Sequence, residues 1–403
     1  MLHDPVRHEP LREQRWDEAR ARDCIQRIVD GLEDDFTPGL GWLEHPRDDP
    51  RQPDSRNPSL YYGASGVIWS LQYLRAAGAA QPRRQEWLDT DTLLAMTRQW
   101  LGDEAERERA AFLMGETPIR LMEMARSAGP RQAACADALA MLIEGNLAHP
   151  ARELMWGSPG TLLAALFLHR RTAEARWATL FRRSAAQLLG EMRWSAQRQC
   201  WYWQQDLYGS QSTYLDAVHG FVATASPIIA GRDLLPDWPT WRERIAGTIR
   251  ATAIHEDGAV TWPVMLEHPA GAPDKRLMQY CHGAPGFVVC LGGFPDDALD
   301  DLLAGAGEAT WRAGPLAKGS NLCHGTGGNG YAFLKLYRRT GQPVWLERAR
   351  AFAMHGIGQF EADLVECGRL RASLWSGDPG FAIYLWDCIR GEADFPTLDV
   401  FWS

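Results

Sequence analysis

The chain has 403 residues, of which 45% are hydrophobic and 23% are charged, a composition typical of a soluble globular protein with a large core. It carries 42 basic and 51 acidic side chains, and this net charge of −9 argues against nucleic acid as the main partner, because binding phosphates requires a basic surface. No apolar run approaches the roughly 20 residues of a membrane span, and the charged N-terminus shows no secretory signal, so we expect a cytoplasmic protein.

Residues 1–58 precede the repeated pattern described next, and we expect them to lead into or cap a single large domain formed by residues 59–403. From there on, a glycine-containing turn followed by an apolar run recurs seven times. The runs are apolar on nearly all sides, as in TLLAALFL at 161–168, which is typical of buried helices. We expect the glycines to supply positive φ and close backbone approach where the chain enters these helices. The leading glycines are Gly63, Gly115, Gly157, Gly220, Gly283, Gly325 and Gly377.

Segments with helical spacing and one polar face lie between the turns and are predicted to be outer helices. An alternation of outer and buried inner helices predicts an all-α fold, an α/α toroid of about seven inner and seven outer helices. An open solenoid would share the pattern, but it would expose one flank of inner helices that are too apolar for exposure. The predicted outer helices span 85–101, 131–147, 175–193, 238–253, 296–312 and 344–362.

Two of the turns contain the tripeptide Cys-His-Gly, at 281–283 and 323–325, and a third turn has His219 before its glycine. Thiolate sulfur and imidazole nitrogen suit Zn²⁺, and sparse cysteines in a reducing compartment are better metal ligands than disulfide partners. The spacing equally allows buried thiols with helix-capping histidines. Three protein ligands would leave one zinc position for water or a thiol, whereas a fourth ligand, His282, would close the site. Spacing does not decide between these arrangements.

The chain resembles the lanthionine synthetase C-like proteins. The motifs that carry the resemblance are YCHGAPGF at 280–287, NLCHGTGGNGYAFLKLY at 321–337, AVHG at 217–220 and the repeated turns. The motifs look closer to the stand-alone glutathione-binding members than to many bacterial cyclases. The resemblance implies an α/α toroid and a zinc enzyme. Such an enzyme adds a thiol, from glutathione or a peptide cysteine, to dehydroalanine or dehydrobutyrine and forms a thioether.

The resemblance also implies roles for individual residues. Cys281, Cys323 and His324 match the family's zinc ligands, and the histidine after the first cysteine is not a ligand there. His219 matches the general acid/base, for which a near-neutral unperturbed pKa is suited. Glu153 matches the active-site carboxylate, where lanthionine cyclases have aspartate.

Two basic residues are compared with substrate-binding positions of the family, and only one of them stands at the matching position. Lys318 stands where the glutathione-binding members have a basic residue that contacts glutathione. Leu277 occupies the place of the cyclases' active-site arginine, and Arg276 lies one position away.

The partners implied are a dehydrated peptide or protein and glutathione. The main alternative is a non-catalytic glutathione- or protein-binding scaffold that keeps a structural zinc. Another toroid enzyme, a prenyltransferase-like protein or a glycosidase, is less well matched, because neither its zinc ligand set nor its facing carboxylates stand out in the sequence.

Overall fold

The computed structural model describes residues 2–48, 50, 52–267 and 276–402, and helices dominate these residues. Within this part of the chain, sheet structure is confined to three two-stranded antiparallel hairpins, and no helix combines the length and the apolarity that crossing a bilayer requires. The chain divides into two compact units that are each discontinuous in sequence. Unit 1 comprises residues 1–6, 110–112 and 140–314, and unit 2 comprises residues 7–109, 113–139 and 315–403.

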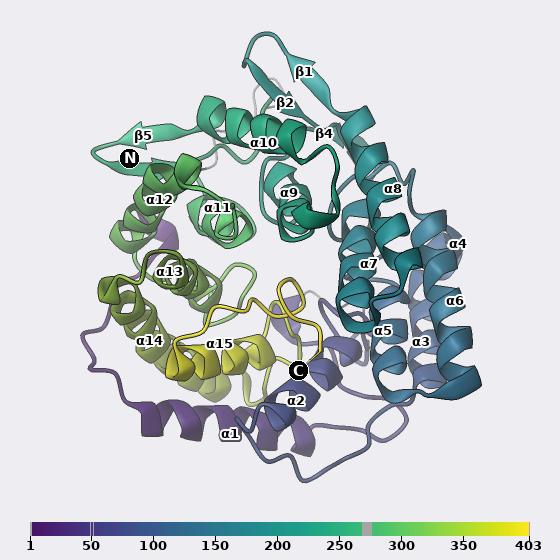
Figure 1. Ribbon diagram of the computed structural model, residues 1–403. Helices are drawn as coiled ribbons and strands as arrows, with labels where there is room; N and C mark the ends of the chain where they lie inside the picture. The colour runs from purple at the N-terminus through teal and green to yellow at the C-terminus, as the bar shows by residue number, and fades with distance from the viewer. Residues whose placement is uncertain (1, 49, 51, 268–275, 403) are drawn as a thin grey trace. The chain divides into compact units, whose positions relative to one another are not determined.

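Unit 1 combines helices with all three hairpins, in which β1 pairs with β2, β3 with β4 and β5 with β6. Helix α11 packs against α9 and α12, and α10 packs against β2 (Figure 1). The α-helices are α7 (Ser158–Thr172), α8 (Ala175–Glu191), α9 (Phe221–Ala230), α10 (Trp238–Thr252), α11 (Ala284–Leu291) and α12 (Asp300–Ala313), and the 3-10 helices are η4 (Arg232–Leu234) and η5 (Asp297–Leu299). The strands are β1 (Arg193–Ser195), β2 (Cys200–Tyr202), β3 (Gln205–Leu207), β4 (Ser210–Ser212), β5 (Ile254–Glu256) and β6 (Ala259–Thr261).

The pair α7 and α8 illustrates the predicted alternation of inner and outer helices. Every residue of α7 from Ser158 to Leu168 is buried, as expected of a helix that is apolar on all sides. Its neighbour α8 buries positions such as Trp177, Phe181 and Leu188, which recur at helical spacing and leave one face polar. The sequence pattern therefore translates directly into one buried and one half-buried helix.

All the regular elements of unit 2 among the described residues are helices. Helix α13 packs against α14 and α15, and α15 also packs against α1 and α2 (Figure 1). The elements are α1 (Glu18–Asp34), η2 (Pro46–Asp48), α2 (Ala64–Ala76), α3 (Thr90–Leu101), η3 (Gly102–Glu104), α4 (Ala105–Glu108), α5 (Thr117–Arg126), α13 (Thr326–Thr340), α14 (Pro343–Cys367) and α15 (Asp378–Arg390), while η1 (Pro5–Arg7) and α6 (Gly129–Gly145) include residues of both units. Helix α1 lies in the segment predicted to lead into the domain and buries Ile25 and Ile28. The boundary at residue 58 stays a prediction.

Each of the seven predicted turns leads into a helix, which starts within two residues of the leading glycine, and each predicted outer segment contains a helix. The expectation of positive φ is wrong for most of these glycines. Gly220 has a φ of −115°, whereas Gly283 has a φ of 122°. Close approach is the general reason for glycine: a Cβ on Gly220 would lie 2.1 Å from the backbone nitrogen of Asp216, and one on Gly283 would lie 2.1 Å from the carbonyl oxygen of Leu277.

Candidate active site and metal-binding residues

Two predicted residues, Glu153 and His219, meet in unit 1. The Nδ1 atom of His219 lies 3.0 Å from Oε2 of Glu153, and the Glu153 side chain is fully buried. Glu153 also accepts hydrogen bonds from the backbone N–H groups of Met155 (2.8 Å) and Trp156 (2.6 Å). These bonds fix the carboxylate, and the carboxylate in turn orients the imidazole. The contact identifies Nδ1 as the ring nitrogen of His219 that faces the carboxylate.

A second carboxylate–imidazole pair lies in the same unit. Oδ2 of the fully buried Asp216 is 2.8 Å from Nδ1 of His282, while Oδ1 accepts from the backbone N–H groups of Val218 (3.0 Å) and His219 (2.7 Å). Burial alone would raise the pKa of the Asp216 carboxyl, but the facing His282, with smaller contributions from His219 and the Val218 N–H, holds that pKa below its ordinary value. Asp216 is therefore a carboxylate that fixes both its own turn and one imidazole.

Glu153 and Asp216 each stand four residues before the leading glycine of a turn, a position from which a side chain can cap the turn. A side chain there caps the turn by accepting from a backbone N–H two or three residues later. Neutral side chains suffice for this purpose, so the turn alone does not require the negative charges of Glu153 and Asp216. The neutral acceptors at the same position are Ser59, Asn321 and Ser373, which bind the N–H groups of Tyr62, His324 and Ser376 at 3.0, 3.0 and 3.3 Å.

Each predicted zinc cysteine has a hydrogen-bond donor from its own unit. Gln279 Nε2 donates to Sγ of Cys281 (2.9 Å), and the Tyr61 hydroxyl donates to Sγ of Cys323 (2.6 Å). Both cysteines are buried. Donors of this kind stabilise a thiolate rather than a thiol.

Among the described residues, Cys281, Cys323 and His324 form a possible metal-binding group. Each offers one atom that can bind a metal ion. Two sulfurs and one imidazole are a donor set that suits Zn²⁺, so the residues present fit the metal that the sequence predicts. His282 is not a member of this group.

The two predicted basic residues are both exposed. Lys318 borders a small cavity of unit 2, of about 20 Å³, together with Arg371 and Asp378. Its backbone carbonyl accepts a hydrogen bond from Nδ2 of Asn321 (3.0 Å). Arg276 begins the segment described after residue 275. The substrate-binding roles of Lys318 and Arg276 stay predictions.

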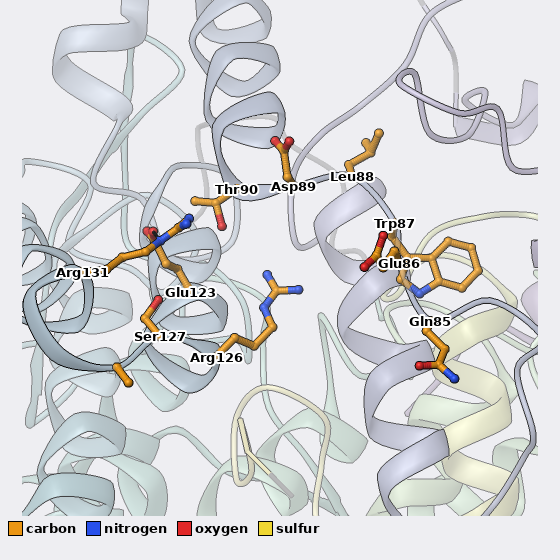
Figure 2. A pocket seen from close by; sticks show the side chains of 11 residues that line it. Gln85, Glu86, Trp87, Leu88, Asp89, Thr90, Glu123, Arg126, Ser127 and Arg131 are labelled. Carbon is orange, nitrogen blue, oxygen red and sulfur yellow. Dashed lines mark hydrogen bonds and ion pairs between the residues drawn. The ribbon is translucent and has the colours of Figure 1, made fainter.

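A larger cavity, of about 680 Å³, opens in unit 2 between the start of α3 and the end of α5 (Figure 2). Arg126 extends into the space between Glu123 and Trp87. Both oxygens of the Glu123 carboxylate are engaged by arginines other than Arg126. None of the predicted site residues lines this cavity, so it is separate from the site that the sequence indicates.

Sequence reasoning gave no role to several residues that touch the predicted ones. Asp216 could have been found, because, like Glu153, it stands four residues before a turn glycine. Gln279 lies two residues before a zinc-site cysteine, which is a weak signal. Tyr61 and Tyr208 contact predicted residues only through the fold, and no sequence pattern marks them.

The profile of the family described as Lanthionine synthetase C-like protein matches residues 8–400. A Danio rerio protein named glutathione S-transferase LANCL1 is 30% identical over 214 residues, 47% of either chain, and the Arabidopsis thaliana LanC-like protein GCL1 is 42% identical over 90 residues, 21% of either chain. The chain thus covers less than half the length of these curated relatives.

A solved structure of nisin cyclase is similar to this chain, with a TM-score of 0.56 over 92% of this chain and 93% of that one. At 13% identity this similarity shows the fold alone. The fold is an all-α α/α toroid, which confirms the prediction from the repeated turns.

Proposed function

The chain belongs to the lanthionine synthetase C-like family, and on that premise we propose that it is a zinc-dependent enzyme that adds a thiol to dehydroalanine or dehydrobutyrine residues and forms a thioether. The observation that carries the proposal is the donor set of Cys281, Cys323 and His324. A zinc ion held by these residues would keep a substrate thiol in its reactive thiolate form at neutral pH.

The Glu153–His219 pair supports the proton transfers that the addition requires. The thiol loses its proton, its sulfur bonds to the β-carbon, and the electron pair of the double bond moves toward the α-carbon, which must then receive a proton. Because Glu153 engages Nδ1 of His219, proton exchange with the substrate would use Nε2. Positioned proton transfer of this kind typically contributes about 10²–10⁴-fold to the rate.

Two substrates are compatible with this chemistry, and we favour glutathione as the thiol donor over a cysteine of the acceptor peptide. The presence of glutamate at position 153 and lysine at position 318 supports this choice. The name of the Danio rerio relative, a glutathione S-transferase, points the same way. The acceptor would be a dehydrated peptide or protein, and a reducing, cytoplasmic location would suit both the thiol and the zinc thiolates.

The test is mass spectrometry of a dehydroalanine peptide incubated with glutathione, with initial rates compared against a reaction without protein. We expect the wild-type protein to accelerate the addition and Cys323→Ala to abolish the acceleration. His219→Asn should lose roughly 100-fold or more, because it removes the proton-exchanging nitrogen. Cys367→Ala is the matched control, since this half-buried cysteine at the end of α14 is outside the ligand set.

Equal rates with and without the wild-type protein would contradict catalysis. The alternative would then be a scaffold that binds glutathione or a protein and keeps zinc for stability. An unchanged rate in Cys323→Ala would separate any catalysis from the metal-binding group.

A further inference from the structure

The hairpins β3–β4 and β5–β6 of unit 1 have turns of the same shape and different sequence. Both turns place two residues at positive φ: Tyr208 and Gly209 at 53° and 77°, and Asp257 and Gly258 at 50° and 77°. This two-residue turn favours Asn, Asp or Gly at its first position, because their side chains tolerate the left-handed region. Asp257 therefore suits its turn. Tyr208 does not, and the turn itself gives no reason for a tyrosine there.

Hydrogen bonds join the β3–β4 hairpin to the residues before Glu153 and to the segment that leads to His219. The side chain of the buried Gln205 accepts from the backbone N–H of Tyr214 (2.8 Å) and donates to its carbonyl (3.3 Å). The backbone N–H of Asp206 donates to the carbonyl of Pro150 (3.0 Å). Residues with disfavoured φ on rigid supports are often found where a side chain must be presented in one direction.

The side chain of Tyr208 points toward the Glu153–His219 pair. Its ring stands nearly perpendicular to the His219 ring, at 85° and with 6.2 Å between centroids. Its hydroxyl accepts from Nε1 of Trp156 (3.1 Å) and donates to Sδ of Met155 (3.8 Å). Despite these contacts Tyr208 is 75% exposed. An aromatic ring thus lies beside the candidate acid/base, fixed at its hydroxyl and open to a ligand.

We infer that Tyr208 is a substrate-binding residue, whose ring supports the dehydroamino acid next to His219. This inference rests on the proposed function. A dehydroalanine residue is flat, because its α- and β-carbons are conjugated with the adjacent amides. A flat conjugated group packs on an aromatic ring over its whole area, whereas the tetrahedral α-carbon of an ordinary residue does not. The ring would therefore favour dehydrated over saturated peptides.

The decisive variant is Tyr208→Asn, because asparagine suits the left-handed turn while the ring is lost. We expect the KM for a dehydroalanine peptide to rise about three- to tenfold, with kcat within about twofold of wild type. The melting temperature should be equal or higher. Tyr208→Phe keeps the ring and should stay within about twofold of wild type in KM. Trp194→Ala, at another exposed aromatic residue of unit 1, should change neither constant.

An unchanged KM in Tyr208→Asn would overturn the inference, and so would a lower melting temperature, which would assign the tyrosine a structural role. A second measurement separates this inference from the proposed function. In the Cys323→Ala background, binding of a dehydroalanine peptide is compared with binding of the same peptide containing alanine. A preference for the dehydrated peptide that Tyr208→Asn removes would support the inference even if no catalysis is observed. Equal binding of the two peptides would overturn it.

Discussion

The two Cys-His-Gly turns share three residues in sequence but hold their histidines differently. In the turn at 281–283 the imidazole of His282 is engaged by the buried carboxylate of Asp216, at 2.8 Å. In the turn at 323–325 the imidazole of His324 belongs to the possible metal-binding group together with both cysteines. The same tripeptide therefore contributes one residue to the possible metal-binding group from the first turn and two from the second. Identity of sequence does not make two histidines equivalent.

The local backbone accounts for this difference. In the first turn Gln279 and His282 exchange backbone hydrogen bonds, both of 3.1 Å, and Gly283 follows at a φ of 122°. In the second turn the side chain of Asn321 caps the N–H of His324, and Gly325 follows with an extended φ of −120°. The two histidine side chains thus leave differently shaped turns.

The largest effect expected from this comparison is on metal content. His324→Ala removes a ligand and should weaken zinc binding by more than about 100-fold, because even the loss of an outer hydrogen bond commonly costs 10–100-fold. His282→Ala should keep about one zinc per chain. Metal analysis after dialysis against a weak chelator measures both.

Loss of zinc from His282→Ala alone would show that the wrong histidine has been assigned. Loss from both variants, with a lower melting temperature in each, would show that the turns rather than the ligands had been disturbed. Retention of zinc in both variants would leave the two cysteines as the whole ligand set.

The next effect concerns Asp216, the carboxylate that engages the imidazole of His282 in the first turn. The pKa of Asp216 is lower in the folded protein than its ordinary value of 3.8. The ionised carboxylate therefore stabilises the fold at pH values above 3.8, and this stabilisation is lost as the pH falls through the lower pKa of the folded state. Asp216→Asn should lower the free energy of unfolding at pH 7 by about 1–3 kcal/mol. In Asp216→Asn the free energy of unfolding should also fall less steeply than in the wild type as the pH is lowered into the acid range.

Urea unfolding at a series of pH values from 7 to 3 measures both effects, and Asp233→Asn is the control, because Asp233 lies on the surface of the same unit with its side chain 91% exposed. A pH profile of Asp216→Asn parallel to that of the wild type would contradict an ionised Asp216 in the folded state.

Much of the fold was predictable because it rests on local patterns. A buried helix such as α7 and an amphipathic one such as α8 follow from where apolar residues recur, and the turn glycines mark where helices begin. The glycine φ values were not predictable, because the need for glycine comes mainly from backbone segments that approach it closely, as Asp216 approaches Gly220.

The candidate site was predictable in part. Motifs and resemblance indicated the three ligands, Glu153 and His219. The engagement of His282 by Asp216 was not predictable, because the two residues are 66 positions apart and meet only through packing. The same holds for Tyr61, which contacts Cys323 from 262 positions away.

The smallest effect expected concerns the hydrogen-bond donors to the two cysteine sulfurs. The donor is an amide in the first turn and a hydroxyl in the second. Tyr61→Phe removes the hydroxyl that donates to Cys323, and Gln279→Leu removes the amide that donates to Cys281. Either change leaves the thiolate with one hydrogen bond fewer, so zinc affinity should fall about tenfold in chelator competition. Tyr73→Phe, at a buried tyrosine of α2, should leave the affinity unchanged. If Tyr61→Phe and Gln279→Leu bind zinc as tightly as the wild-type protein, the donors serve packing alone. If only one of the two variants weakens zinc binding, only the cysteine that lost its donor in that variant needs a hydrogen bond to stabilise its thiolate charge. The two turns would then differ in function as well as in shape.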